Sequence, residues 1–139
     1  MVPDPEADQG EHIFTYALFP HQEEWTSAGT AKEAWALNSP LIAAEGSATL
    51  ERFSLFALPS CDHVMIDAVK KSEDGDAVIV RLHEYTGRRG MVELQCGLSV
   101  SGWQETDLME RPYAESRMEE PVSFLMKPYE IKTLLLHFD

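Results

Sequence analysis

One segment of this sequence, His63–Gly87, constrains the fold more than any other because it contains two alternating runs joined by a polar turn. The segment is HVMIDAVKKSEDGDAVIVRLHEYTG, with Gly75 at the tip of the turn. Side chains along a strand point alternately to opposite faces, so alternating apolar and polar residues indicate half-buried strands. The first run places Val64, Ile66 and Ala68 on one face and Asp67 on the other. The second run opposes Val78, Val80 and Leu82 to Ile79, Arg81 and His83. We therefore predict an antiparallel hairpin here.

Further short strands are predicted around this hairpin at spacings of about ten residues, which is typical of antiparallel sandwiches. The run MVELQCGLSV predicts a strand with Val92, Leu94, Cys96 and Leu98 facing inward. The other candidate strands are FSLFALP at 53–59, WQETDLME at 103–110, PVSFLMK at 121–127 and the closing run at 131–138. The predicted fold class is all-β, an antiparallel β-sandwich of immunoglobulin-like or jelly-roll type. A short helical excursion is expected near residues 22–38, broken near Gly29.

Three regions are predicted from the change in residue composition along the chain. Residues 1–10 are acidic and proline-bearing, which indicates a flexible leader. Residues 11–48 contain the strand-like HIFTYALFP followed by the helical connector, and residues 49–139 form the antiparallel β-sandwich.

Charge and cysteine content exclude several classes of function. Of the 139 residues, 24 are acidic and 11 are basic, so the net charge of −13 repels phosphate backbones and anionic lipid surfaces. We expect no nucleic-acid partner and no membrane partner. The two cysteines, Cys61 and Cys96, rule out a disulfide scaffold and a four-cysteine zinc site. The first residues lack the basic and apolar regions of a signal peptide, and a cytoplasmic location is expected.

The titratable side chains show no pattern of a self-contained active site. The five histidines have no metal-ligand spacing, and His63 and Asp67 would lie about 13 Å apart along one strand. The carboxylates at 73–76 belong to a turn, and Glu105, Asp107 and Glu110 are interpreted as a solvated strand edge. His63 lies two residues from Cys61, and no serine has a GxSxG setting. We expect no catalytic residue, no metal site and no cofactor in this chain.

Aromatic side chains provide an alternative functional interpretation. Flat rings serve as sugar-stacking platforms on many β-sandwich modules. Trp25, Trp35 and Trp103 are the candidate carbohydrate contacts, and core packing is the competing role for each ring. A free-standing carbohydrate-binding module is therefore the alternative function.

The order of five segments resembles a known family. HIFTYALFPHQEEW, ALNSPL, VMIDAVKKSEDGDAVIVRLHEYTGRRG, ETDLMERP and MKPYEIKTLLL occur in the order, and at roughly the spacings, of the C-terminal end of glycoside hydrolase family 38 α-mannosidases. The resemblance spans about residues 12–137. It implies the C-terminal β-sandwich domain of such an enzyme, with HIFTYAL resembling the tail of a preceding β domain.

The resemblance also implies that catalysis belongs to a different domain of the enzyme. Family members hydrolyse α-mannosides with retention, using a zinc ion and an aspartate nucleophile that lie in an N-terminal domain without a counterpart in this sequence. No catalytic or zinc-binding residue can be carried over, so the implied role is a non-catalytic accessory and structural domain. The implied partners are the remaining domains of the parent enzyme, and an α-mannoside substrate through the full-length enzyme.

Specific residues match the family's motifs and are expected to act structurally. His83 and Tyr129 depart from the pattern by replacing one ring with another. The matched positions are Lys70, Glu73, Asp74, Gly75, Arg81, Glu84, Gly87, Gly90, Glu110, Lys127, Pro128, Glu130, Ile131 and Thr133.

Three physical expectations concern these motifs. Arg81 is expected to form a bidentate pair with Glu130 or Glu110. Pro128 removes a ladder donor and should mark a bend or a sheet edge. The closing run TLLLHF is apolar on both faces, so it is expected to be a central strand that is covered by the opposite sheet and by a neighbouring domain.

Overall fold

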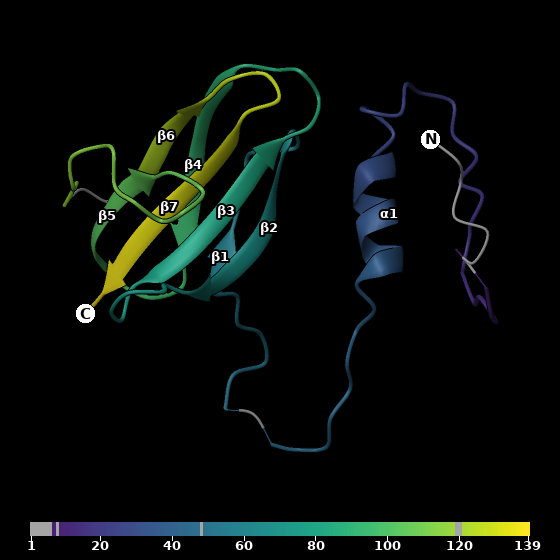
Figure 1. Cartoon of the computed structure of the whole chain (residues 1–139), viewed down its shortest axis with the longest axis horizontal. Coiled ribbons are helices and arrows are strands. Elements are labelled where there is room, and N and C mark those ends of the chain that lie inside the picture. Colours follow the sequence, from purple (N-terminus) through teal and green to yellow (C-terminus); the bar gives the residue numbers. More distant parts are fainter. Residues whose placement is uncertain (1–6, 8, 48, 119–120) are drawn as a thin grey trace. The chain divides into compact units, whose positions relative to one another are not determined.

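The structure is a computed structural model that describes residues 7, 9–47, 49–118 and 121–139. The chain divides into two compact units, and the boundary in the sequence lies between Ile42 and Ala43. The expected leader at 1–10 lies largely outside the described residues. Figure 1 shows the strands gathered in the C-terminal unit and the one helix in the N-terminal unit.

The C-terminal unit is an antiparallel β-sandwich, which confirms the predicted fold class (Figure 1). One sheet has three strands in the order β1-β4-β6, and the other has four in the order β2-β3-β7-β5. All of the pairings are antiparallel. The strands are β1 Phe56–Ala57, β2 Val64–Lys71, β3 Val78–Glu84, β4 Gly90–Cys96, β5 Val100–Thr106, β6 Val122–Met126 and β7 Ile131–Phe138.

The core lies between the two sheets and is built from the inward faces that alternation predicts. The largest buried ring is Trp103 of β5, which meets Phe124 of β6 edge-on with ring centroids 6.4 Å apart. The other buried members are aliphatic and come from both sheets: Val64, Val80, Leu82, Val92, Leu94, Val100, Val122, Met126, Leu134 and Leu136. Burial of this apolar set is the main stabilising term of the unit.

The closing strand β7 is central, because it pairs with β3 on one side and β5 on the other. Leu134 and Leu136 face the opposite sheet in the core. On the outer face Leu135 is buried together with Ala77 and Ile79. Leu135 also lines a pocket with Met109–Pro112, so part of the outer face is covered by the chain's own loop after β5. A neighbouring domain is not needed to bury this leucine.

Two details of the predicted strands are corrected by the structure. A register shift between Ile66 and Ala68 pairs Ala68 with Arg81, so Ala68 does not share the inward face of Ile66. This β-bulge adds a residue at Asp67 and reverses the alternation beyond it. Leu98 was predicted to face inward, but it lies in the exposed turn between β4 and β5 because the strand ends at Cys96.

The N-terminal unit contains one helix, α1 Thr30–Asn38, within the predicted helical excursion. The helix follows Gly29, which has the left-handed φ of 76° that glycine adopts at low cost. No helix in the described part of the chain is long and apolar enough to cross a membrane.

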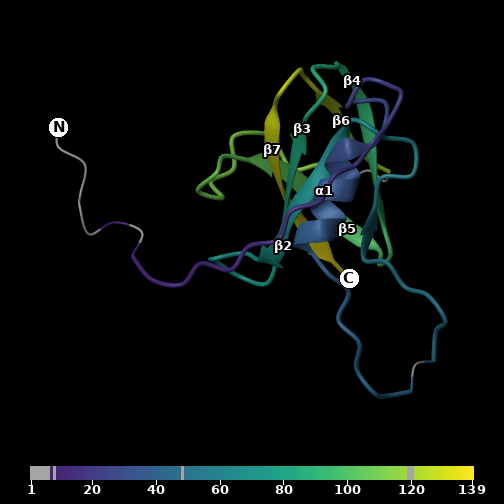
Figure 2. The same ribbon diagram turned by 90° about the vertical axis from the view of Figure 1, so that its right-hand side faces the viewer.

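The predicted strand at HIFTYALFP is not present as a strand. Residues 13–19 are an extended segment without a ladder partner among the described residues (Figure 2). A strand requires a second strand for its backbone hydrogen bonds, and the strands found in the described ranges all belong to the other unit.

Candidate functional site

Glu84 is the centre of a hydrogen-bond network at one end of the sandwich. It is the last residue of β3, and its side chain lies on the inward face at 2% exposure. Its Oε1 accepts from Thr86 N at 2.9 Å, Thr86 Oγ1 at 2.6 Å and Arg88 N at 3.1 Å. Its Oε2 accepts from Gly87 N and Tyr129 N, each at 2.8 Å. One carboxylate therefore holds both the loop after β3 and the turn before β7.

The hydrogen bonds keep this buried carboxylate ionised. Burial alone would raise the pKa of Glu84, but the bonds from Thr86, Tyr129 and Arg88 outweigh it and lower the pKa to about 2. Several donors aimed at a carboxylate favour its charged form in this way. The network is thus complete at neutral pH without a cationic side chain among its donors.

The turn Lys127–Glu130 joins β6 to β7 and contains Pro128 at its second position. Glu130 N donates to Lys127 O at 3.2 Å, while Lys127 N donates to the Glu130 carboxylate at 2.7 Å. Tyr129 has a φ of 56°, which is unusual for a residue with a side chain. A positive φ at the third position is the geometry of a type II turn, and the Glu84 bond to Tyr129 N helps to hold it.

Gly87 faces this turn at close range. It has a φ of 81°, and a Cβ built there would lie 2.8 Å from Tyr129 Oη. The backbone angle therefore favours glycine, and a Cβ at this position would have to displace the Tyr129 ring.

A second network fastens the loop after β5 to the hairpin of β2 and β3. Lys70 Nζ lies 2.6 Å from Glu73 Oε1 and 2.7 Å from Glu110 Oε1. The other oxygen of Glu110 accepts from Glu73 N at 2.8 Å. The bond to Glu110 raises the pKa of Lys70, and the same bond lowers the pKa of Glu110. Glu110 has a φ of 65°. Within the described part of the chain, both non-glycine residues with positive φ therefore lie in turns that these two networks hold.

The prediction that Arg81 pairs with Glu130 or Glu110 is wrong. Among the described residues Arg81 pairs with neither Glu110 nor Glu130 within 4.0 Å; it donates instead to Leu108 O at 3.2 Å and Thr133 Oγ1 at 3.3 Å. The Glu110 carboxylate is paired with Lys70 instead. Arg81 therefore also holds the loop after β5, through a carbonyl rather than a carboxylate.

The sequence interpretation missed a buried ion pair. Lys132 of β7 is 8% exposed, and its Nζ lies 2.5 Å from Oε2 of Glu105 on β5. Tyr113 Oη also donates to Glu105 at 3.3 Å. Glu105 is therefore not the solvated strand edge that the sequence predicts. The signal in the sequence is the alternation of side chains along β7, which places Lys132 on the same face as Leu134 and Leu136. A charged group on that buried face needs a partner of opposite charge.

Two histidines have polar partners without forming a recognisable active site. His63 Nδ1 lies 3.4 Å from Cys61 Sγ, and His83 Nδ1 lies 2.7 Å from Asp67 Oδ1. In the described ranges no group of three or more His, Cys, Asp or Glu side chains could hold a metal ion. The residues described here therefore do not provide the site that a zinc ion needs.

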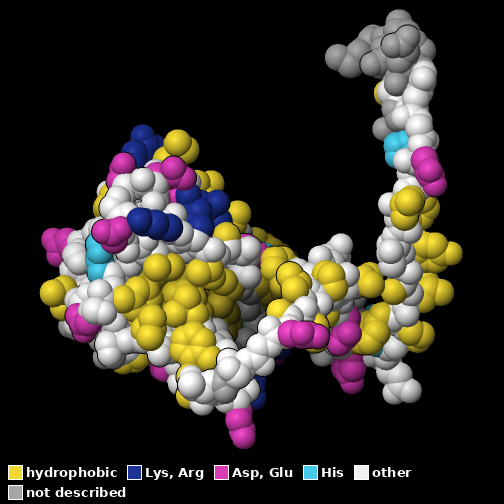
Figure 3. Space-filling view, turned by 90° about the horizontal axis from the view of Figure 1, so that it is seen from below, with side chains coloured by type: hydrophobic (Ala, Val, Ile, Leu, Met, Phe, Trp, Pro, Cys, Tyr) yellow, Lys and Arg dark blue, Asp and Glu magenta, His cyan; other side chains and the backbone are white. Residues whose placement is uncertain are grey.

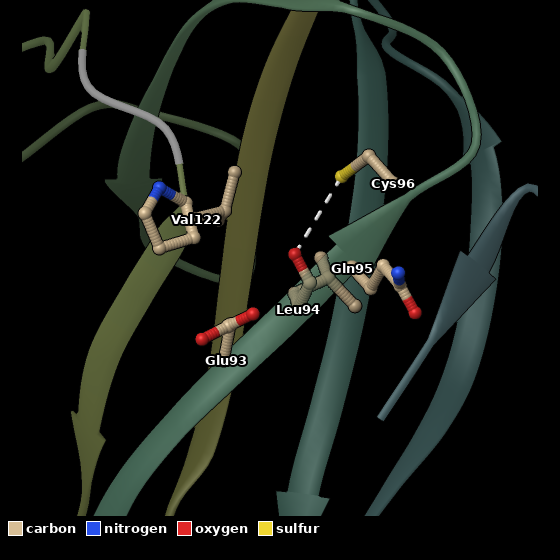
Figure 4. A pocket seen from close by; sticks show the side chains of 6 residues that line it. Glu93, Leu94, Gln95, Cys96 and Val122 are labelled. Atoms are coloured by element: carbon tan, nitrogen blue, oxygen red, sulfur yellow. Dashed lines mark hydrogen bonds between the residues drawn. The ribbon is translucent and has the colours of Figure 1, made fainter. Parts of the chain in front are cut away.

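One pocket of about 370 Å³ is lined by Glu93, Leu94, Gln95, Cys96, Pro121 and Val122. Figure 4 shows these side chains around the end of β4, where Cys96 Sγ contacts Leu94 O at 3.8 Å. Among the described residues of the lining, Glu93 is the one carboxylate.

The three candidate sugar-contacting tryptophans are not brought together on one surface. Trp103 is 2% exposed, packs in the core and carries the Arg117 guanidinium 4.8 Å from its ring centroid. Its ring faces are therefore closed to a sugar, which corrects the expectation for this residue. Trp25 and Trp35 are partly exposed and lie in the N-terminal unit.

One end of the sandwich carries a group of exposed hydrophobic side chains (Figure 3). The segments at this end include the approach to β1 and the turn between β4 and β5, where Phe53 and Leu98 are exposed. Phe53 packs closely on Gly97, since a Cβ at Gly97 would lie 3.2 Å from its ring. An apolar end of this kind is typical of a surface that meets another protein part.

Comparison with known proteins identifies the family. No solved structure matches the chain. Human "Alpha-mannosidase 2C1" is 32% identical over 143 residues, which cover 97% of this chain and 14% of that protein. "Alpha-mannosidase G" of Dictyostelium discoideum is 26% identical over 144 residues, which cover 94% of this chain and 13% of that protein. The chain thus spans about one seventh of the length of the relatives it matches.

A family model described as "Glycosyl hydrolases family 38 C-terminal beta sandwich domain" matches residues 63–134. The match runs from the start of β2 into β7 and includes both side-chain networks. The chain therefore belongs to the family of glycosyl hydrolase family 38 C-terminal β-sandwich domains.

Proposed function

We propose that this chain acts as the non-catalytic accessory domain of an α-mannosidase and works as part of a larger polypeptide. The observation that carries the proposal is the pair of coverages: 97% of this chain matches only 14% of human "Alpha-mannosidase 2C1". A domain of this proportion supplies a minor part of such an enzyme. The α-mannoside substrate and the zinc ion would be held by the remaining domains.

The side-chain networks support a structural role. Glu84 and Glu110 hold loops of the sandwich, and their carboxylates accept hydrogen bonds from Thr86 N and Glu73 N. Lys70 pairs with the Glu110 carboxylate. Groups engaged in this way give a firm scaffold and leave little capacity for acid–base chemistry. The chain has only two cysteines among its 139 residues and therefore no disulfide-rich framework, and we further propose a cytoplasmic location.

The test compares the native polypeptide with the isolated chain. An antibody raised against the C-terminal unit should detect a native polypeptide about seven times the 15.7 kDa mass of this chain, as the 14% coverage requires. The immunopurified polypeptide should hydrolyse an aryl α-mannoside, while the isolated 139-residue chain should give no turnover. A native band of only 15.7 kDa, or zinc-dependent turnover by the isolated chain, would contradict the proposal.

Carbohydrate binding is the second candidate, favoured by the partly exposed rings of Trp25 and Trp35. Titration of the chain with mannose oligosaccharides, followed by NMR of the indole N–H signals, separates the two functions. Saturable shifts at Trp25 or Trp35 would support binding, and the buried Trp103 serves as the internal reference.

A further inference from the structure

We propose that two copies of this chain pair edge to edge through β6, Val122–Met126, and form a symmetric dimer. β6 is the last strand of the order β1-β4-β6, so one side of it is bonded to β4 and the other side is a sheet edge (Figure 1). Within the described part of the chain, no strand or bridge pairs with that outer edge. Open N–H and C=O groups at an edge are a template for another strand. Such a dimer is independent of the proposed function, because it concerns association and not catalysis.

Two other sheet edges in the described structure carry features that prevent this kind of pairing. β2 has the bulge at Asp67 and ends on Lys70 and Lys71, and both bulges and lysines discourage pairing at an edge. β5 is covered by the chain's own segment, because Trp103 N donates to Arg117 O at 2.9 Å and Arg117 N donates to Trp103 O at 2.8 Å. As described, β6 pairs with β4 without a register shift, and its five residues carry no charge.

The side chains of β6 suit a partner with the same surface. The inward residues of β6 are buried in the core of the sandwich: Val122, Phe124 and Met126. On the outer face Leu125 stands opposite Met91 of β4, and these two side chains are 42% and 66% exposed. Pairing of β6 with its copy brings two such apolar pairs onto one face of the joined sheet and removes apolar surface from water.

Charge and symmetry indicate a second copy of the chain as the occupant. The net charge is −13, so two copies repel each other wherever their carboxylates meet. The uncharged β6 avoids this repulsion, since Glu93 of β4, on the same outer face, stands opposite Ser123 and thus one strand away from the edge. A two-fold axis at β6 sets the strand antiparallel to its copy, which is the direction of the pairings within both sheets.

The assembly closes after two copies. The two three-stranded sheets form one continuous sheet with a copy of β1 at each outer edge. β1 has only two residues, and beyond it Ser60 and Cys61 line a pocket with Met91 and Val92 of β4. A short edge strand of this kind does not extend a sheet, so we expect a dimer and not a fibre.

Sedimentation velocity of the 139-residue chain measures the association. Because five residues make a small contact, we expect a dissociation constant of about 100 μM. The mass should be 15.7 kDa in dilute solution and should double as the concentration rises. In the same series, the amides of β6 that point away from β4 should exchange with deuterium about tenfold more slowly in the dimer. A mass that stays at 15.7 kDa up to about 1 mM would overturn the dimer.

Leu125→Lys and Met91→Lys form a matched pair of substitutions. Both place one lysine on the outer face and change the net charge equally, but only position 125 lies on the edge strand. Like charges across the new ladder should raise the dissociation constant of Leu125→Lys at least about tenfold, while Met91→Lys should change it less than about threefold. Equal effects of the two variants would contradict pairing through β6. The concentration series of the wild type decides the question even if a variant does not fold.

A mixture of oppositely charged variants tests the two-fold symmetry. Leu125→Lys and Leu125→Glu should each dimerise weakly alone, and an equal mixture should recover the dimer because the charges across the axis are then opposite. The absence of recovery would overturn the symmetric pairing, as would a mass that grows beyond a dimer. Protection of the β6 amides at every concentration in the full-length polypeptide, but at none in the 139-residue chain, would replace the second copy by a strand of the enzyme.

Discussion

Glu84 combines two properties that rarely occur together, a nearly buried carboxylate and a strongly lowered pKa. Its folded pKa of about 2 lies below the ordinary 4.5. A lowered folded pKa means that the stabilisation is complete above about pH 4.5 and is lost as the pH falls toward 2. The shift corresponds to a contribution on the order of 3 kcal/mol.

Glu84→Gln should therefore lower the free energy of unfolding by roughly 3 kcal/mol at pH 7, because the amide offers donors where only acceptors fit. The difference between wild type and variant should shrink as the pH falls from 4.5 toward 2. Urea unfolding across this range measures both quantities. Glu93→Gln, at an exposed position of β4, is the control and should change little. Parallel pH profiles for wild type and Glu84→Gln would show that the network does not depend on the charge.

Gly87 and Gly75 form a natural comparison, because their φ angles are 81° and 85° but their surroundings differ. An alanine at either position pays about 1 kcal/mol for the left-handed backbone. Only Gly87→Ala also meets the Tyr129 ring, 2.8 Å from the new Cβ, while the space at Gly75 is open. We expect Gly87→Ala to cost about 2 kcal/mol and Gly75→Ala about 1 kcal/mol in thermal unfolding. Equal losses would mean that the ring moves aside freely.

At the scale of elements, the Lys132–Glu105 pair couples β7 to its neighbour β5. Removing one member of a mostly buried pair leaves the other charge uncompensated, at a cost of about 3 kcal/mol. Lys132→Met should show this loss, and the double variant with Glu105→Leu should recover most of it. Lys71→Met is the control, since its pair with Asp76 is exposed and contributes at most about 1 kcal/mol. Additive losses in the double variant, measured by denaturant unfolding, would contradict this coupling.

At the scale of the whole molecule, the core lies entirely within the C-terminal unit, Ala43–Asp139. A fragment with these bounds should therefore keep a cooperative thermal transition and its near-ultraviolet signal from Trp103. Differential scanning calorimetry and circular dichroism measure the two properties. A gradual transition without a heat-capacity peak would show that the sandwich needs the first 42 residues.

The sequence by itself determined the fold class, the strands β2, β3, β4, β6 and β7, and the position of α1. Alternation and turn residues are local properties, so short windows carry them. Residues from two of the family motifs are neighbours in space, because Glu84 and Gly87 both contact Tyr129 in the turn at 127–130.

The tertiary structure alone decided how these elements meet. The bulge at Asp67 changed the face of Ala68, and the short β1 replaced a longer predicted strand. Glu84 and Tyr129 are 45 residues apart, while Lys132 and Glu105 are 27 apart. Such pairs depend on which strands are neighbours and in what register, which no local window contains. The segment at 13–19 shows why residue preference alone does not make a strand. Its residues favour a strand, but a strand forms only where a second backbone supplies the hydrogen bonds.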